Sequence, residues 1–337
     1  MTLITSYCRH ITLAIAAALA ISLTHAAAAE TIKIGILKLA SSGPVFIAKE
    51  RGYFAAENLD PELVFFDAAQ PIAVAAAAGA IDFGVGGATA ALYSLAEQGK
   101  IRIIAGNHRE APTFHNQAFL VSQKAFDNGL RGYADLAGRS VAVSQIGSPP
   151  HYTLALIAEK YRIDLKTIQV LPLQSIPNNI SAVRGGKADA TFLPVTAVGG
   201  ALAHGDIRSL GWVGDAVPWQ VGVVIAPTKL LGDSNVAERF LRAFRKGALE
   251  HHDAFADAHD KRRDGDTAGA VASLIASYLS VAPEKVIASI SFIDRDARLD
   301  VVDIQHQIAW YRSQDMLKGG TDATVMDKRL IMPLPAR

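Results

Sequence analysis

The chain has 337 residues, with 33 Lys and Arg against 32 Asp and Glu, a formal net charge of +1, and a single cysteine. A nucleic-acid-binding protein would be expected to show a basic excess or a basic stripe, and this balance argues against one. The chain is longer than the size at which one hydrophobic core usually keeps growing, so we expect two lobes.

The first 29 residues have the pattern of a secretory signal peptide. Arg9 and His10 precede an apolar run over 11–23, and a run of alanines follows over 26–29. The apolar run is shorter than the roughly 20 residues that cross a bilayer, and a basic start with a small-residue site is typical of a cleaved export signal. We predict cleavage between Ala29 and Glu30. The alternative is a buried N-terminal helix or a membrane anchor.

The single cysteine, Cys8, lies ahead of the apolar run. A lipoprotein signal would place its acylated cysteine after that run. The mature chain would therefore contain no cysteine, which excludes disulfides, thiolate metal ligands and cysteine nucleophiles from it.

From Thr31 onward, short apolar segments alternate with segments of helical pattern. We expect strands over 32–37, 63–66, 81–85 and 102–105, with helices over 45–56, 71–78 and 88–98. A proline opens the helix at Pro71 and Gly79 closes it. Such alternation predicts a mainly parallel sheet covered by helices.

A second series of the same kind follows the extended stretch 117–121. We expect strands over 140–143, 168–171 and 188–192, and helices over 150–160, 177–184 and up to His204. The block 79–102 is echoed by 186–208, since each runs through a glycine, a strand with an early aspartate (Asp82 or Asp189), a helix, a second glycine and Ile-Arg. This echo supports two similar lobes.

After the apolar stretch 221–226 the pattern changes to long helices over 234–255, 267–279 and 299–316, and we expect no further strands. The simplest arrangement packs this tail on the first lobe, with chain crossings near Gln117 and Val221. The predicted organisation is a signal peptide over 1–29, the first part of lobe 1 over 30–117, lobe 2 over 118–222, and the return segment of lobe 1 over 223–337.

Two blocks of the first lobe resemble a known family. They are Lys49-Glu50-Arg51-Gly52-Tyr53-Phe54 and Gly79-Ala80-Ile81-Asp82-Phe83-Gly84, and the second lobe carries a related segment over 180–190. Over about residues 31–310, the chain is similar to the nitrate-, sulfonate- and taurine-type substrate-binding proteins of ABC transporters. The resemblance implies a periplasmic protein with a two-lobed α/β periplasmic binding protein fold (type II), each lobe a mainly parallel sheet flanked by helices. The substrate does not carry over, because such families diverge in it.

Ligands of open α/β sheets lie beyond the carboxyl ends of the strands, where loops lead into helices. In the first lobe this rule selects the loop over 38–44, whose candidate residues are Lys38, Ser41, Ser42 and Gly43. Unpaired backbone N–H groups at the following helix start would favour an anionic or carbonyl oxygen. The alternative is an ordinary serine cap without a ligand.

The rule selects one more loop in each lobe. In the loop 86–89, Gly87 would let the backbone approach a ligand and Thr89 would offer a hydroxyl, although packing alone also explains the glycines. The loop 144–151 of the second lobe is the leading candidate for ligand contact, through Gln145, Ser148 and His151. His151 would face the cleft or else lie on the surface near a helix start.

Further candidates follow other strands. They are Asn107, Arg109, Thr196, Trp212 and Trp219. A cleft arginine would pair bidentately with a carboxylate or sulfonate, whereas a solvated loop arginine is the alternative. Either tryptophan would provide a flat wall for an apolar or aromatic ligand, although core packing is the commoner fate of this residue.

Several residue types that bind metals lie close together at one predicted helix end. They are His251, His252, Asp253, Asp257 and His259. Because the run lies in a polar helix end, we expect a solvated face and no metal site.

The predicted function is capture of a small, anionic organic solute by hinge closure, followed by docking on a membrane ABC permease. We expect a monomer without cofactor or nucleic-acid partner. The rival is an enzyme on the same fold, such as a thiamine pyrimidine-precursor synthase or a menaquinone-pathway dehydratase. The export signal and the absence of a cysteine-rich motif or a nucleophile–base spacing oppose it. A regulator's sensing domain would need a DNA-binding module, for which we see no room before Thr31.

Overall fold

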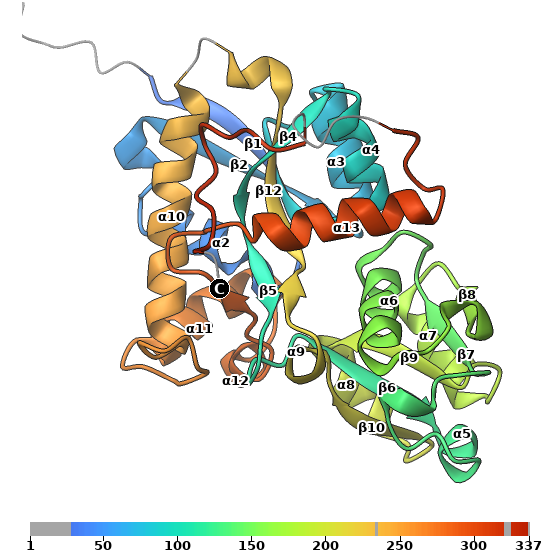
Figure 1. Cartoon of the computed structure of the whole chain (residues 1–337). Coiled ribbons are helices and arrows are strands. Elements are labelled where there is room, and N and C mark those ends of the chain that lie inside the picture. The colour runs from blue at the N-terminus through green and yellow to red at the C-terminus, as the bar shows by residue number, and fades with distance from the viewer. Residues whose placement is uncertain (1–27, 233–234, 320–324, 336–337) are drawn as a thin grey trace, which may run out of the picture.

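The computed structural model describes residues 28–232, 235–319 and 325–335 (Figure 1). The predicted signal peptide, with Cys8, lies outside the described residues except for its last two positions. Among the described helices, none is both long and apolar enough to cross a membrane.

The first lobe is built on a five-stranded sheet in the order β2-β1-β3-β12-β4. Its strands are β1 (Glu30–Leu37), β2 (Leu59–Phe66), β3 (Phe83–Gly87), β4 (Ile101–Gly106) and β12 (Gly222–Pro227). β12 runs antiparallel to both of its neighbours, whereas β1 pairs in parallel with β2 and β3. The one antiparallel strand is thus the strand that returns to this lobe late in the chain.

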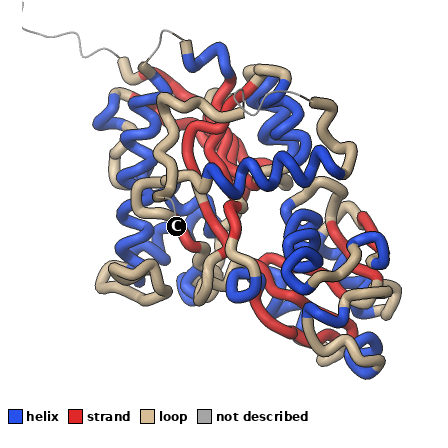
Figure 2. The backbone as a smooth tube through the Cα atoms, in the orientation of Figure 1, coloured by secondary structure: helices blue, strands red, loops and turns tan. Residues whose placement is uncertain are grey.

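Helices cover both faces of this sheet (Figure 2). They are α2 (Gly43–Glu50), α3 (Ala69–Ala78), α4 (Ala90–Glu97), α10 (Val236–Phe255), α11 (Ala268–Leu279), α12 (Pro283–Ile287) and α13 (Val301–Ser313), with short 3-10 turns at Ala40–Ser42, Ala55–Glu57 and Thr228–Leu231. The helix α10 lies directly on α2, where a Cβ at Gly247 would come within 2.1 Å of the Pro44 carbonyl oxygen. The C-terminal helices therefore pack on the first lobe.

The second lobe repeats this topology, with strands in the order β8-β7-β9-β6-β10. Its elements are β6 (Gln117–Ser122), α5 (Gln123–Asp127), a 3-10 turn at Tyr133–Asp135, β7 (Ser140–Val143), α6 (Pro149–Tyr161), a 3-10 turn at Leu165–Thr167, β8 (Gln169–Pro172), α7 (Ile176–Arg184), β9 (Ala190–Pro194), α8 (Val195–Leu202), β10 (Ile207–Trp212) and α9 (Val213–Ala216). β6 is antiparallel to β9 and β10. It occupies the place that β12 has in the first lobe, because each is the first strand after a crossing.

The two crossings lie side by side in a small antiparallel sheet of order β11-β5-β13. Its strands are β5 (His108–Glu110), β11 (Trp219–Gln220) and β13 (Phe292–Ile293). β13 corrects the expectation that no strand follows residue 226. A strand of two residues carries no periodicity, so the sequence pattern does not reveal it.

Candidate functional site between the lobes

The loops that follow β3 and β7 lie directly against each other. The backbone N–H of Ala90 donates to the carbonyl oxygen of Gly147 at 3.0 Å. A Cβ on Gly87 would lie 3.0 Å from Cγ of Pro149. Two loops predicted from different lobes are therefore brought together at one point.

Beside this contact, an open groove of about 460 Å³ is shared by both lobes. Its lining residues are Ala68, Gln70, Pro71, Val74, Ala75, Ala78 and Gln145. All but Gln145 belong to α3 or the residue before it, and the lining is almost entirely apolar. The alanines of α3 project little into the groove, because the alanine side chain ends at Cβ. The two glutamines supply amide donors and acceptors.

Hydrogen-bond donors of the loop 144–151 are bound by acceptors within the same loop. The hydroxyl of Ser148 donates to the Gln145 carbonyl oxygen at 2.6 Å, and the N–H of Gly147 donates to Nδ1 of His151 at 3.1 Å. Pro149 and Pro150 occupy the first turn of α6 and have no N–H. The start of α6 thus offers few unpaired backbone amides to a ligand.

His151 is a buried residue of the interface between lobes. Burial lowers its pKa to about 4, so the ring is neutral at neutral pH and Nδ1 is free to accept the Gly147 hydrogen bond. The ring lies edge-on to Trp310 of α13, with centroids 5.1 Å apart. These contacts give His151 a structural role at the interface between the lobes.

Tyr152 of α6 inserts between aromatic side chains of the first lobe and the second crossing. Its ring centroid lies 5.1 Å from Trp219, 5.4 Å from Trp310 and 5.9 Å from Tyr311. Its hydroxyl lies 2.9 Å from Nδ1 of His306. Burial raises the pKa of Tyr152 and Tyr311 above the usual range. We call Tyr152, Trp219, Trp310 and Tyr311 the aromatic joint.

Trp219, predicted as a possible cleft wall, is fully buried in this aromatic joint. Trp212 is half-buried and stacks on His115, with centroids 4.2 Å apart and an interplanar angle of 10°. Neither tryptophan lines the groove beside α3. In this structure Trp219 is packed in the core.

A buried polar network ties the second crossing to α13. One carboxylate oxygen of Asp303 accepts from the N–H of Gln220 at 2.8 Å and from the amide of Gln307 at 2.7 Å. The Gln307 side chain also accepts from the Tyr93 hydroxyl at 2.8 Å. Burial raises the pKa of Asp303 to about 6, against hydrogen bonds that lower it.

Arg109 forms an ion pair across the same region. Its Nη2 lies 2.7 Å from a carboxylate oxygen of Asp300, and their side chains are 8% and 18% exposed. The predicted anion partner is thus supplied by the protein itself, at the start of α13. Arg109 ties the first crossing to this helix.

The loop 38–43 divides between surface and core. Lys38 is exposed, whereas Ser41, Ser42 and Gly43 are buried. The Ser42 hydroxyl donates to the Leu37 carbonyl oxygen at 2.7 Å, and a Cβ on Gly43 would lie 2.8 Å from Cδ1 of Ile275. Packing against α11 explains the glycine.

Other candidates have separate roles. The amide of Asn107 donates to the Ser41 carbonyl oxygen at 3.1 Å, which joins two of the predicted positions. Thr89 caps α4 by accepting from the Leu92 N–H at 3.1 Å. Thr196 is exposed on the first turn of α8 and does not line the groove.

Several residues that shape this region were absent from the candidates named from the sequence. The aromatic joint depends on Tyr152 and on Trp310, which arrives from a helix far along the chain, and Asp303 comes from the same helix. No local motif marks them. The groove residues Gln70 and Val74 follow the exit of β2, so the strand-exit rule applied to that strand would have selected them.

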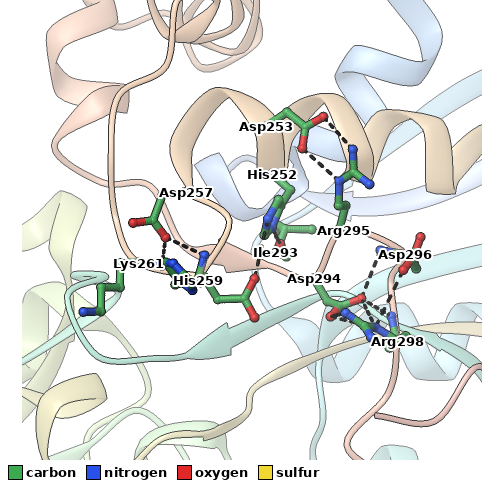
Figure 3. A network of polar contacts seen from close by, with 11 residues as sticks. His252, Asp253, Asp257, His259, Lys261, Ile293, Asp294, Arg295, Asp296 and Arg298 are labelled. Carbon is green, nitrogen blue, oxygen red and sulfur yellow. Dashed lines mark hydrogen bonds and ion pairs between the residues drawn. The ribbon is translucent and has the colours of Figure 1, made fainter. Parts of the chain in front are cut away.

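The histidine- and aspartate-rich end of α10 is occupied by internal contacts (Figure 3). Asp253 forms an ion pair with Arg295, and Nδ1 of His252 lies 3.0 Å from the Ile293 carbonyl oxygen. The Asp257 carboxylate accepts from the N–H groups of His259 and Lys261. Within the described ranges, no group of three or more such residues is placed to hold a metal ion.

This end of α10 differs from the expected solvated face in one respect. His251 and His252 are both buried. Burial lowers the pKa of His251 to about 3, which keeps its ring neutral. The helix turns these two histidines toward the core, and only its polar flank faces solvent.

Two α/β lobes of equal topology, joined by two crossings, define the periplasmic binding protein fold predicted from the sequence, and comparison with solved structures confirms it. The chain belongs to the NMT1/THI5-like family, whose model matches residues 40–254. No curated protein sequence matches the chain.

Three solved structures illustrate the similarity in fold. The periplasmic aliphatic sulphonate-binding protein SsuA of Escherichia coli is 18% identical, with 91% of this chain and 94% of that chain covered and a TM-score of 0.67. The nitrate-binding protein NrtA of Synechocystis PCC 6803 is 14% identical, covers 89% and 86%, and has a TM-score of 0.65. The CA3427 gene product of Candida albicans, described as having the generic periplasmic binding protein fold, is 16% identical, covers 91% and 98%, and has a TM-score of 0.67. The predicted similarity in fold to sulfonate- and nitrate-binding proteins is thereby confirmed.

Proposed function

We propose that this chain is the substrate-binding component of an ABC-type importer and captures a small organic solute between its lobes. The observation that carries the proposal is the groove of about 460 Å³ to which α3 of the first lobe and Gln145 of the second both contribute. A solute held there would contact both lobes at once. The volume of the groove lies in the range of small-molecule sites, about 300–1,000 Å³.

Capture would involve movement about the paired strands β5 and β11. Both crossings run side by side through one small sheet, so a change in their twist would rotate one lobe against the other. The Ala90–Gly147 hydrogen bond and the aromatic joint would open in the same movement. We propose that the solute stabilises the closed arrangement.

The solute we propose is an organic anion with an apolar body. The apolar wall of α3 suits the body. An anionic group is supported by two proteins of similar fold, which bind an aliphatic sulphonate and nitrate. Arg109 is engaged by Asp300 and the start of α6 offers few amides, so the side-chain amides of Gln70 and Gln145 would bind the anionic group.

We propose binding without catalysis. The shifted pKa values between the lobes have burial as their main cause, and the groups concerned are engaged in packing or hydrogen bonds. His151 accepts a backbone N–H, so it is not placed as a general base. We further propose export through the N-terminal signal, monomeric behaviour and docking on a membrane permease.

A panel of sulfonates, nitrate, carboxylates and aromatic acids tests the proposal by the shift of melting temperature and of tryptophan emission. We expect saturable stabilisation by at least one organic anion and recovery of that solute unchanged. Absence of any response would overturn the assignment of the solute class. Conversion of the solute would overturn the assignment as a binding protein.

A further inference from the structure

A second cavity, of about 300 Å³, lies where the first crossing leaves the small hinge sheet. It is lined by Thr113, His115, Arg262, Arg263, Asp264, Ile287, Ala288 and Ile290. Two of these residues belong to the segment between β5 and β6, and the others to the segments around α11 and α12. The lining shares no residue with the groove beside α3, and polar atoms make up most of it.

The cavity carries more positive than negative charge. Arg262 lies 2.5 Å from Asp264, and its guanidinium also donates to the carbonyl oxygens of Phe255 and Ile287, which hold it in place. Arg263 is exposed and forms no ion pair among the residues that the structure describes. One aspartate therefore faces two arginines, with the ring of His115 beside them.

The first crossing is held in a strained conformation at this cavity. Thr113 has a φ of 69°, a left-handed value that β-branched residues rarely adopt. Its N–H donates to Asp215 at 2.9 Å, and its hydroxyl accepts from the Arg262 N–H at 3.0 Å. Such strain persists only where the surroundings enforce it, and it concentrates at functional sites.

His115 extends the connection to the second lobe. Its ring stacks on Trp212 at the end of β10, with centroids 4.2 Å apart. Asp215, the acceptor for Thr113, lies in α9 just beyond. The wall of the cavity, which includes part of the first crossing, is thus in contact with the second lobe.

We propose that this cavity binds a small oxyanion, a phosphate or a carboxylate. Arg263 supplies planar N–H donors that match such an anion bidentately, Arg262 adds positive charge beside it, and Thr113 and His115 add shorter polar groups. The volume of about 300 Å³ suits a small ligand. An anion held by Arg263 and His115 links the C-terminal part of the first lobe to the first crossing, and so restrains the hinge.

The experiment titrates the purified protein with sodium phosphate and, separately, sodium acetate, against sodium chloride at equal ionic strength. Tryptophan emission and melting temperature are recorded. We expect at least one of the two oxyanions to give a saturable response, and we expect chloride to give none. The separate phosphate and acetate titrations identify which oxyanion binds. Arg263→Gln should raise the dissociation constant about tenfold, as for loss of one charge-assisted hydrogen bond. His115→Gln should weaken binding in the same direction.

Arg131→Gln is the matched control, because it removes one exposed arginine of the second lobe that does not line the cavity. It should leave the dissociation constant unchanged. Trp212→Phe should abolish the change in emission while the thermal stabilisation remains. A response no greater than that of chloride would overturn the proposal, as would equal weakening by Arg263→Gln and Arg131→Gln. The dependence on Arg263 and His115 distinguishes these outcomes from binding in the groove beside α3, because neither residue lines that groove.

Discussion

Asp189 accepts a hydrogen bond on Oδ2 from the backbone N–H of Ser140, 49 residues earlier, at 2.8 Å. In the first lobe, Asp82 accepts on Oδ2 from the N–H of Lys33, also 49 residues earlier and also at 2.8 Å. Asp82 and Asp189 each lie just before a strand, β3 or β9, and their partners lie near the start of the parallel neighbour, β1 or β7. Each bond fixes the alignment of two parallel neighbours.

The two aspartates should differ in their contribution to stability. Asp189 also accepts from the Ser140 hydroxyl at 2.9 Å, and this pair is more buried than the Asp82 pair. We expect Asp189→Ala to lower the free energy of unfolding by about 2 kcal/mol and Asp82→Ala by about 1 kcal/mol. Urea denaturation measures both, with the exposed Asp60→Ala as control. Equal losses, or none, would contradict the proposed role.

The ion pair between Arg109 and Asp300 should stabilise the junction of the first crossing with α13. Asp300→Asn removes the charge but keeps a side-chain oxygen for the N–H of Asp303, which Asp300 caps at 3.1 Å. Breaking a buried pair costs about 3–5 kcal/mol, and the partial exposure of Asp300 lowers this to about 2 kcal/mol. Urea denaturation at low and high salt measures the loss of unfolding free energy. A change in the free energy of unfolding of less than about 0.3 kcal/mol would show that the pair does not contribute to stability.

Glu110 should make stability depend on pH. It lies at the end of β5, and burial raises its pKa to about 8 despite a hydrogen bond from Asn116. The folded state therefore binds more protons than the unfolded state between about pH 4.5 and 8, so this group's contribution to stability falls as pH rises through that window.

Glu110→Gln tests this dependence, because the amide keeps the oxygen that accepts from Asn116. The free energy of unfolding of the variant relative to the native protein should rise between pH 5 and 8 and level off above pH 8. His108, His151 and His251 have lowered pKa values and act in the opposite direction below pH 6.5, but they are common to both proteins and cancel. A difference that does not vary with pH would contradict the account.

Tyr152 should hold the lobes together through the aromatic joint. Tyr152→Ala removes a fully buried ring and should lower the free energy of unfolding by about 3–5 kcal/mol. Tryptophan emission should shift to the red as Trp219 and Trp310 gain access to water. The control is Tyr161→Ala on the same helix, which removes a ring at the surface. An unchanged emission spectrum in Tyr152→Ala would indicate that the joint does not exclude water.

Much of the architecture could be predicted because its signals are local. Glycine, aspartate and strand patterns recur around Asp82 and Asp189, and the structure gives them the same hydrogen bond. Strand exits at 38–44 and 144–151 could be recognised for the same reason. The two-residue strand β13 could not, because it is defined only by pairing with β5.

The roles of individual side chains depend on contacts between distant segments. Arg109 finds its partner 191 residues later, so its loop position alone suggested a free cation. Trp219 is buried because Tyr152 arrives from the other lobe. The prolines that mark the start of α6 also remove the N–H groups that an anion would need, which weakens a prediction based on the helix start alone.

If the solute lies against α3 in the groove shared by both lobes, an aspartate inside the groove should weaken binding, whereas one outside it should not. Val74 in the groove and Val302 on α13 are 51% and 75% exposed, so an aspartate at either position should not disturb folding. Equilibrium dialysis with a solute identified in the panel should give an affinity at least about tenfold lower for Val74→Asp, since a charge in an apolar site costs more than 1.4 kcal/mol. Val302→Asp should bind like the native protein. Equal affinity of Val74→Asp and the native protein would contradict the account.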